Sequence, residues 1–181
     1  MDLQIALLLG QDGIINGAIY GLMALALVLV FSVTRVIFVP QGDFVAFAAL
    51  SMAALSAGKT PAVIWLLGAL ALATLVSETI RWRRGAPVEW VATLAWTVVV
   101  PGAAIAAALA KPSSVVLQAA TTLALVVPLG PLIYRLAFRP LAHATVLMLL
   151  IVSVALHGVM VGLGLFFFGA EGSRTPAFSE A

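Results

Sequence analysis

The sequence predicts an all-α fold, a polytopic transmembrane helical bundle of about six spans. Hydrophobic residues make up 64% of the chain and charged residues only 9%, whereas soluble domains are roughly half apolar and a quarter charged. Charge-free runs alternate with short charged segments, and they cover residues 13–34, 60–77, 90–110, 112–134 and 140–170. A helix needs about 20 apolar residues to cross the hydrocarbon core. Lipid offers backbone polar groups no partners, so such runs must be helical.

The first predicted span covers residues 13–34. It follows an apolar stretch at residues 3–11 that is too short to cross, and we expect an interfacial helical turn there. Gly13, Gly17 and Gly21 recur every four residues along the span. Small residues at this spacing let another helix approach closely, so we predict a packing face.

The second predicted span, residues 43–58, follows a helix break. Pro40 and Gly42 interrupt the preceding helix, and Asp43 is placed to cap the next one through its carboxylate. A helix over these residues rises only about 22 Å, which is less than the hydrocarbon thickness of about 30 Å. The segment is therefore either a short span or a broken, partly unwound one.

Four further spans are predicted at residues 61–80, 88–110, 113–134 and 144–168. Pro101 lies inside the 88–110 span and is expected to kink it. The connections are expected at RWRR (81–84), at Lys111-Pro112 and at YRLAFRPLAH (134–143). The last of these is predicted as a cytoplasmic loop that presents Arg135, Arg139 and Pro140.

The basic residues predict the orientation of the bundle. With six spans, six arginines fall on one side and three basic residues on the other. They are Arg35, Arg81, Arg83, Arg84, Arg135 and Arg139 against Lys59, Lys111 and Arg174. The positive-inside rule places the arginine side in the cytoplasm and both termini outside. If residues 44–58 did not cross, the bias would fall to five against four, so the rule favours six crossings.

The residue types argue against catalysis, a metal site or a cofactor. There are no cysteines, and neither His143 nor His157 has a carboxylate nearby in the sequence. A Gly-rich, lysine-containing phosphate loop is also missing from the sequence. The net charge of +2 is small and scattered, which argues against nucleic-acid binding. We therefore expect a membrane protein that is not an enzyme and that works within the lipid bilayer.

Polar residues within or beside the predicted spans are the candidates for a solute pathway. His157 lies mid-span with Ser153 one turn earlier on the same face. It either bonds to another helix or lines a pathway. Asp43, with Gln41 and Gly42, either caps a helix at the interface or belongs to a broken binding element.

Two further features belong to this set. Asn16 and Tyr20 lie one turn apart beside the glycine face of the first span. They are placed to meet the broken segment or another subunit. Gly158 and Gly162 form a second small-residue pair in the last span, and we predict close helix packing there too.

Two segments resemble the membrane permeases of branched-chain amino acid ABC importers. INGAIYGLMALALVLVFSVTRVIFVPQGDFVAF, residues 15–47, is similar to the opening of that family, with FVPQGD in place of Asn-Phe-Ala-His-Gly-Glu. Residues 134–174 resemble the family's Tyr-Arg-Pro-Leu loop, its next span and the loop beyond. This match rests on FRPL at 138–141 and EGSR at 171–174.

The resemblance implies a permease subunit in the bacterial inner membrane that forms part of a translocation pathway. Its implied partners are a second permease subunit, cytoplasmic ATPase subunits and a periplasmic solute-binding protein. Residues 58–133 are longer than the family pattern by roughly one helical hairpin. Family members also continue beyond the EGSR loop, so the resemblance predicts a fragment or one piece of a split permease.

Three functions stay open on the sequence. The first is import of branched-chain or other hydrophobic amino acids. The second is import of a related small solute such as urea or a short amide. The third is a small non-transporting scaffold or assembly protein derived from a permease half.

Overall fold

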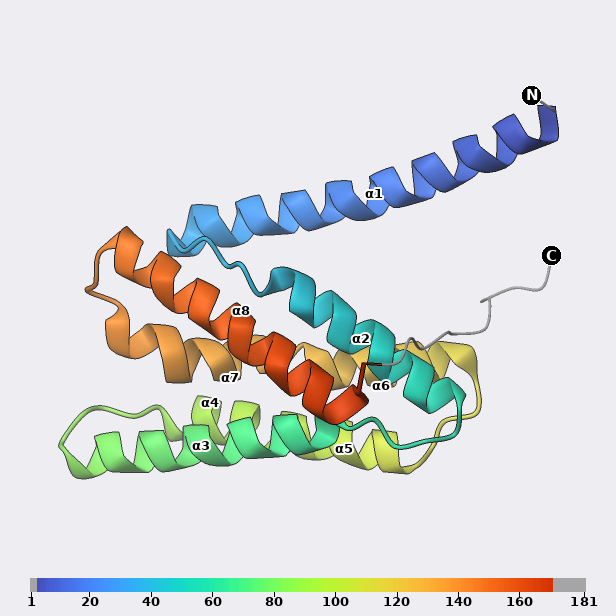
Figure 1. The fold of residues 1–181 in the computed structure, drawn as a ribbon. Coiled ribbons are helices and arrows are strands. Elements are labelled where there is room, and N and C mark those ends of the chain that lie inside the picture. Colours follow the sequence, from blue (N-terminus) through green and yellow to red (C-terminus); the bar gives the residue numbers. More distant parts are fainter. Residues whose placement is uncertain (1–2, 171–181) are drawn as a thin grey trace.

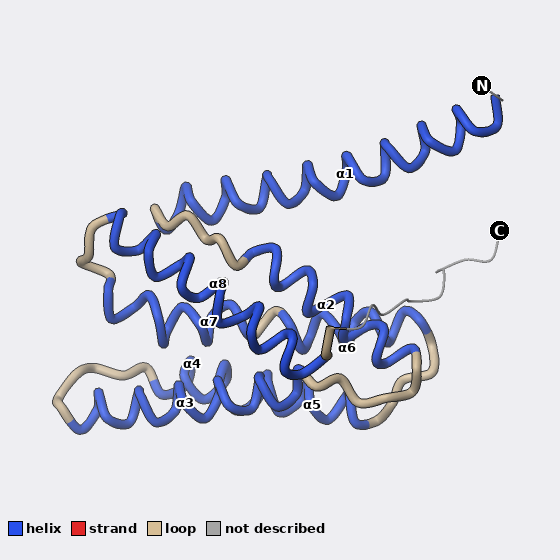
Figure 2. Tube along the Cα trace, in the orientation of Figure 1, coloured by secondary structure: helices blue, strands red, loops and turns tan. Residues whose placement is uncertain are grey.

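The computed structural model describes residues 3–170, and this part of the chain is built from helices joined by short connections (Figures 1 and 2). The helices are α1 (Leu3–Thr34), α2 (Gln41–Ser56), α3 (Val63–Arg83), α4 (Trp90–Leu94), α5 (Val100–Leu109), α6 (Val115–Val126), α7 (Leu129–Ile133) and α8 (Val146–Phe168). A π-helical turn, Ala95–Val99, joins α4 to α5. After α7 the chain continues as a π-helical turn, Tyr134–Phe138, and a 3₁₀ turn, Arg139–Leu141.

Five continuous helical stretches are long and apolar enough to cross a membrane. They are Leu3–Thr34, Val63–Arg83, Trp90–Leu109, Val115–Leu141 and Val146–Phe168, and the shorter apolar helix Gln41–Ser56 accompanies them. The predicted all-α, polytopic membrane bundle is confirmed. By helix length and hydropathy, this is a multi-pass membrane protein.

The chain reverses its direction at each connection between these stretches (Figure 1). The connections at 35–40, 84–89 and 142–145 start at one end of the bundle, and those at 57–62 and 110–114 lie at the other. The C-terminal ends of α1, α3 and the 134–141 segment therefore lie together at one end of the bundle. The arginines of those segments are therefore on one side of the bundle, as the six-span prediction requires.

Two predicted boundaries were wrong. Residues 3–11 are not a separate interfacial turn, because they continue into one helix that runs to Thr34. Residues 134–141 are helical rather than part of a loop. Pro140 stands in the first turn of its 3₁₀ segment, a position where proline needs no backbone N–H donor. Arg135 and Arg139 therefore project from a helical segment, and only residues 142–145 connect it to α8.

Pro101 changes the helix type in the span where a kink was predicted. The π-helical turn Ala95–Val99 ends one residue before α5, and Pro101 stands in the first turn of α5. A proline cannot donate to the carbonyl four residues earlier, and its ring crowds that carbonyl. The wider π-helical turn next to Pro101 is a known way to absorb such an interruption.

The core lies within the part of the bundle formed by α2–α8, which we call the helical body. Leu67, Leu125, Leu129 and Leu132 are fully buried there. Helix α1 differs, because it has no buried residue and extends away from the helical body along most of its length (Figure 1). Its contacts with the body are concentrated near its C-terminal half and the following connection.

Candidate functional site

The connection between α1 and α2 is an unwound segment held inside the bundle. Arg35 has a positive φ of 58°, which ends α1, and both Val36 and Pro40 are buried. The backbone N–H of Val39 donates to Ser153 Oγ at 2.8 Å. Ser153 is the eighth residue of α8, so this contact lies about 10 Å from the start of that helix. Irregular backbone at such a depth needs partners from the protein, and Ser153 supplies one.

Asp43 and His157 meet one turn beyond that contact. His157 Nδ1 lies 2.8 Å from Asp43 Oδ2. This is a hydrogen bond with one shared proton: either imidazole N–H donates to a carboxylate, or a carboxyl O–H donates to neutral imidazole. His157 is the central residue of α8, with eleven helical residues on each side. The pair therefore joins α2 to α8 near the middle of the bundle.

The predicted capping role of Asp43 is wrong. Helix α2 begins at Gln41, so Asp43 is the third residue of its first turn and makes no capping hydrogen bond. Backbone turns formed by Phe38 and Pro40 start the helix instead: Gln41 N–H donates to Phe38 O at 3.3 Å, and Asp43 N–H donates to Pro40 O at 2.9 Å. The carboxylate is consequently available to His157.

Gln41 links the same turn to α1. Its side-chain Nε2 donates to the backbone carbonyl of Met23 at 2.7 Å. Its Oε1 atom is buried and has no hydrogen-bond partner among residues 3–170. An adjoining cavity of about 460 Å³ is lined mainly by apolar side chains. The lining residues are Met23, Ala24, Leu27, Ile37, Phe38, Val39, Gln41 and Gly42.

The structure brings together only some of the candidate pathway residues. Gln41, Gly42, Asp43 and His157 gather around the helix break, and Ser153 joins them. Asn16 and Tyr20 do not, because they lie on the exposed part of α1, where 71% of Tyr20 is accessible.

No close helix packing is seen at the predicted glycine positions within the described residues. A Cβ atom added at Gly13, Gly17, Gly21, Gly158 or Gly162 would meet no atom within 4 Å. The predicted close packing at these faces therefore stays a prediction about another chain. The glycine of α8 that approaches another helix is Gly164, where an added Cβ would lie 3.8 Å from the ring of Phe47.

A second polar cluster, which the sequence did not predict, lies at the arginine end of the bundle. Glu78 on α3 is 98% buried, with 2% of its surface exposed. Arg139 Nη1 donates to its Oε1 atom, and Arg81 Nη1 lies 3.6 Å from its Oε2 atom. Arg135 Nη1 donates to Thr93 Oγ1 at 3.1 Å. The available signal was an acid beside an apolar run, because a buried carboxylate must find a cation.

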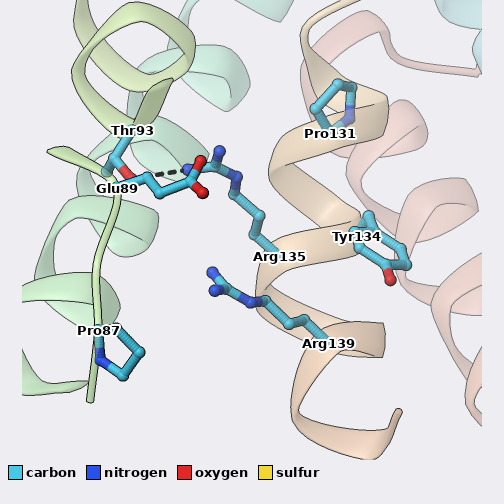
Figure 3. A pocket seen from close by; sticks show the side chains of 7 residues that line it. All are labelled: Pro87, Glu89, Thr93, Pro131, Tyr134, Arg135 and Arg139. Carbon is cyan, nitrogen blue, oxygen red and sulfur yellow. Dashed lines mark hydrogen bonds between the residues drawn. The ribbon is translucent and has the colours of Figure 1, made fainter. Parts of the chain in front are cut away.

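Three residues of this cluster, Thr93, Arg135 and Arg139, border an open cavity of about 470 Å³ (Figure 3). Its lining residues are Pro87, Glu89, Thr93, Pro131, Tyr134, Arg135 and Arg139. In Figure 3, both arginines extend from their helical segment toward the side of the cavity that holds Glu89 and Thr93. The two polar clusters thus occupy different depths, one at the end of the bundle and one near its centre.

Comparison with protein-family models, with curated proteins and with solved structures finds no match. Within residues 3–170, no group of three or more His, Asp or Glu side chains is arranged to hold a metal ion. The EGSR part of the permease resemblance, residues 171–174, and Arg174 of the orientation argument lie outside the described residues.

Proposed function

We propose that this chain is a membrane permease subunit of an ABC importer and that the helix break before α2 forms part of its solute pathway. The observation that carries the proposal is the cavity beside Gln41. Its lining is mainly apolar and includes Gln41, whose side-chain carbonyl oxygen is buried and has no partner among the described residues. Small-molecule sites have this character, an apolar pocket of several hundred Å³ with a few placed polar groups.

The cavity chemistry favours a hydrophobic amino acid over urea or a short amide. Leu27, Ile37 and Phe38 offer apolar contact to an aliphatic side chain. The Oε1 atom of Gln41 is an acceptor, so it suits an N–H donor such as an α-ammonium group. Urea consists almost entirely of polar groups, and this lining would leave most of them unpaired.

The Asp43–His157 pair holds the helix break in place without lining the cavity. Their hydrogen bond fixes the first turn of α2 against α8, and the turn carries Gln41 and Gly42 at the cavity wall. Broken membrane helices serve as binding elements in transporters because the interruption leaves backbone groups inside the membrane. The resemblance of residues 15–47 and 134–174 to importer permeases supports the same function. The second permease, the ATPases and the solute-binding protein belong to this proposal as partners.

Uptake of a labelled branched-chain amino acid by the complete, assembled importer tests the proposal. We expect Asp43→Ala to lower uptake about tenfold or more while the amount of membrane-inserted protein stays normal, because losing one buried hydrogen bond costs only about 1–3 kcal/mol. Asp12→Ala is the matched control, since Asp12 is an exposed acid on α1. Unchanged uptake in Asp43→Ala at normal expression would contradict a pathway role.

A non-transporting scaffold is the second candidate, and one observation favours it. Asp43 and His157 are satisfied by each other, and neither lines the cavity beside Gln41. A scaffold needs this pair only to join helices. In that case Asp43→Ala would reduce the amount of folded protein. Gln41→Leu would leave amino-acid uptake at the level of the unchanged protein, because a scaffold does not bind the solute.

A further inference from the structure

We propose that the arginine end of the bundle binds one anionic phospholipid, with its phosphate at Arg135 and Arg139 and an acyl chain in the neighbouring apolar cavity. This proposal is independent of the importer assignment. It begins from the cavity in Figure 3, where the two guanidinium groups extend toward the same open space. Arg135 and Arg139 are four residues apart on a helical segment, so their side chains leave it on neighbouring turns.

Both arginines are positioned by neutral or acidic neighbours. Arg135 uses Nη1 to bond Thr93 Oγ1, and Arg139 uses Nη1 to bond Glu78 Oε1. A guanidinium group has five N–H donors in a planar fork. The remaining donors of Arg135 suit the bidentate recognition of phosphate oxygens, which is the geometry that arginine provides and lysine does not.

The charge balance at this end favours an anion. Six arginines lie in the segments gathered there, against Glu78 and Glu89. Glu78 is occupied by Arg139 and Arg81. Glu89 is the one carboxylate among the lining residues of the cavity, and it opposes a phosphate. Glu89 therefore lowers the affinity of the site for an anionic headgroup, and substitution of Glu89 should raise that affinity.

Two observations, a neighbouring apolar cavity and a pair of tryptophans at the same end of the bundle, indicate a lipid rather than a soluble anion. A second cavity of about 530 Å³, lined almost wholly by apolar side chains, shares Pro131 and Tyr134 with the first. It extends over the end of α1 and the start of the break, where Val33 and Phe38 line it. A polar cavity that adjoins an apolar one matches a headgroup joined to an acyl chain.

The depth of the site agrees with a headgroup. Trp82 and Trp90 stand at the same end of the bundle, with ring centroids 5.9 Å apart. Tryptophan gathers at the membrane–water interface because its ring is apolar and its N–H is polar. Basic pockets between membrane helices on the cytoplasmic side are suited to anionic headgroups.

Lipid retention measured by native mass spectrometry tests the proposal. The full chain is placed in phosphatidylcholine nanodiscs with an increasing fraction of phosphatidylglycerol, and the phosphatidylglycerol molecules that stay bound are counted. We expect Arg135→Gln to weaken retention about tenfold, because a charge-assisted phosphate contact is lost. Arg84→Gln is the matched control: it removes the same charge from the same end but lies outside both cavities. Equal losses in the two variants would overturn the site.

Two further variants keep the test decisive if Arg135→Gln folds poorly. Glu89→Gln removes the opposing carboxylate and should strengthen retention about threefold. Gly130→Leu should weaken retention without any change of charge, because Gly130 lines the apolar cavity and an added Cβ meets nothing within 4 Å. Unchanged retention in either variant would contradict the proposal.

Competition with soluble anions distinguishes a lipid headgroup from a free phosphate or an acidic peptide as the ligand of the site. We expect millimolar inorganic phosphate and a polyglutamate peptide to leave bound phosphatidylglycerol in place, since neither supplies an acyl chain. Displacement by phosphate alone would assign the site to a free anion. Displacement by polyglutamate would assign it to an acidic segment of a protein partner, and either result would overturn the lipid assignment.

Discussion

Two acid–base pairs join helices that are distant in the sequence, and they differ in depth and in the nature of the base. Asp43–His157 connects α2 to the central residue of α8, whereas Glu78–Arg139 connects the C-terminal part of α3 to the last turn of the 134–141 segment. In both pairs the acid is the more buried member: the side chains are 11% and 45% exposed in the first, and 2% and 37% exposed in the second.

The difference in base decides which charges each pair carries. Arginine stays protonated in proteins, so Glu78 has a permanent cationic partner. Histidine can be neutral, so the hydrogen bond between Asp43 and His157 does not require a permanent cation. A charge near the centre of a membrane is far more costly than one at its edge. The central pair therefore uses the base that can give up its charge, and the end pair uses the one that cannot.

The largest effect on stability is expected from Arg139→Ala. It leaves the buried carboxylate of Glu78 with only Arg81, 3.6 Å away. We expect a loss of about 2–3 kcal/mol in the free energy of unfolding, somewhat less than the cost of breaking a fully buried pair, because Arg139 is partly exposed and Arg81 remains. Thermal melting of the detergent-solubilised chain measures this.

A second substitution checks that prediction. Glu78→Gln in the Arg139→Ala background removes the unpaired charge and should recover part of the lost stability. If the double variant melts at the same temperature as Arg139→Ala, the ion pair is not the cause. Arg83→Ala, at an exposed position on the same helix, should change stability by about 0.5 kcal/mol or less.

A smaller effect is expected from His157→Leu at the central pair. The variant leaves Asp43 without its described hydrogen-bond partner, but the Asp43 side chain is less buried than that of Glu78. We expect a loss of about 1–2 kcal/mol, which corresponds to one lost side-chain hydrogen bond. A loss equal to or larger than that of Arg139→Ala would contradict the proposed difference between the two pairs.

An effect close to zero is expected from Gly17→Leu in the isolated chain. Helix α1 has no buried residue, and a Cβ at Gly17 meets no atom within 4 Å. We expect the melting temperature of the chain alone to stay unchanged, while the complex with the proposed second permease subunit is lost because the small-residue face can no longer pack closely. Co-purification with that subunit measures the second part. Normal assembly of the variant would show that the face is covered by lipid.

The smallest structural effect is expected from single-cysteine substitutions. Their labelling shows on which side of the membrane each end of the bundle lies. The natural chain has no cysteine, so each introduced thiol is the only one. We expect Ser113→Cys to react with a membrane-impermeant thiol reagent in intact cells and Ala142→Cys to react only after the cells are opened. The reverse pattern would place the Glu78–Arg139 end outside and contradict the positive-inside assignment.

The sequence alone was sufficient for the fold class and for the alternating direction of successive spans, while the side of the membrane on which the arginines lie stays a prediction. Hydropathy, run length and the positions of arginine are properties of short segments, and the bilayer sets the length that a span needs. The unwound segment before α2 was foreseeable in part, since Pro40 is a local breaker, whereas Gly42 lies inside α2 and does not interrupt it. The predicted helix boundaries were wrong where helix formers continue past a charged residue, as at residues 3–11 and 134–141.

Only the tertiary structure decided which polar side chains meet. Asp43 and His157 are 114 residues apart, and Glu78 and Arg139 are 61 residues apart. No short-range pattern links either pair. Each contact depends on the rotation and the axial position of two helices, which the packing of many apolar side chains sets together. Asp43 was predicted as a helix cap because the residues next to it in the sequence indicate only a helix start. Its contact with His157 depends on the position of α8, which those residues do not determine.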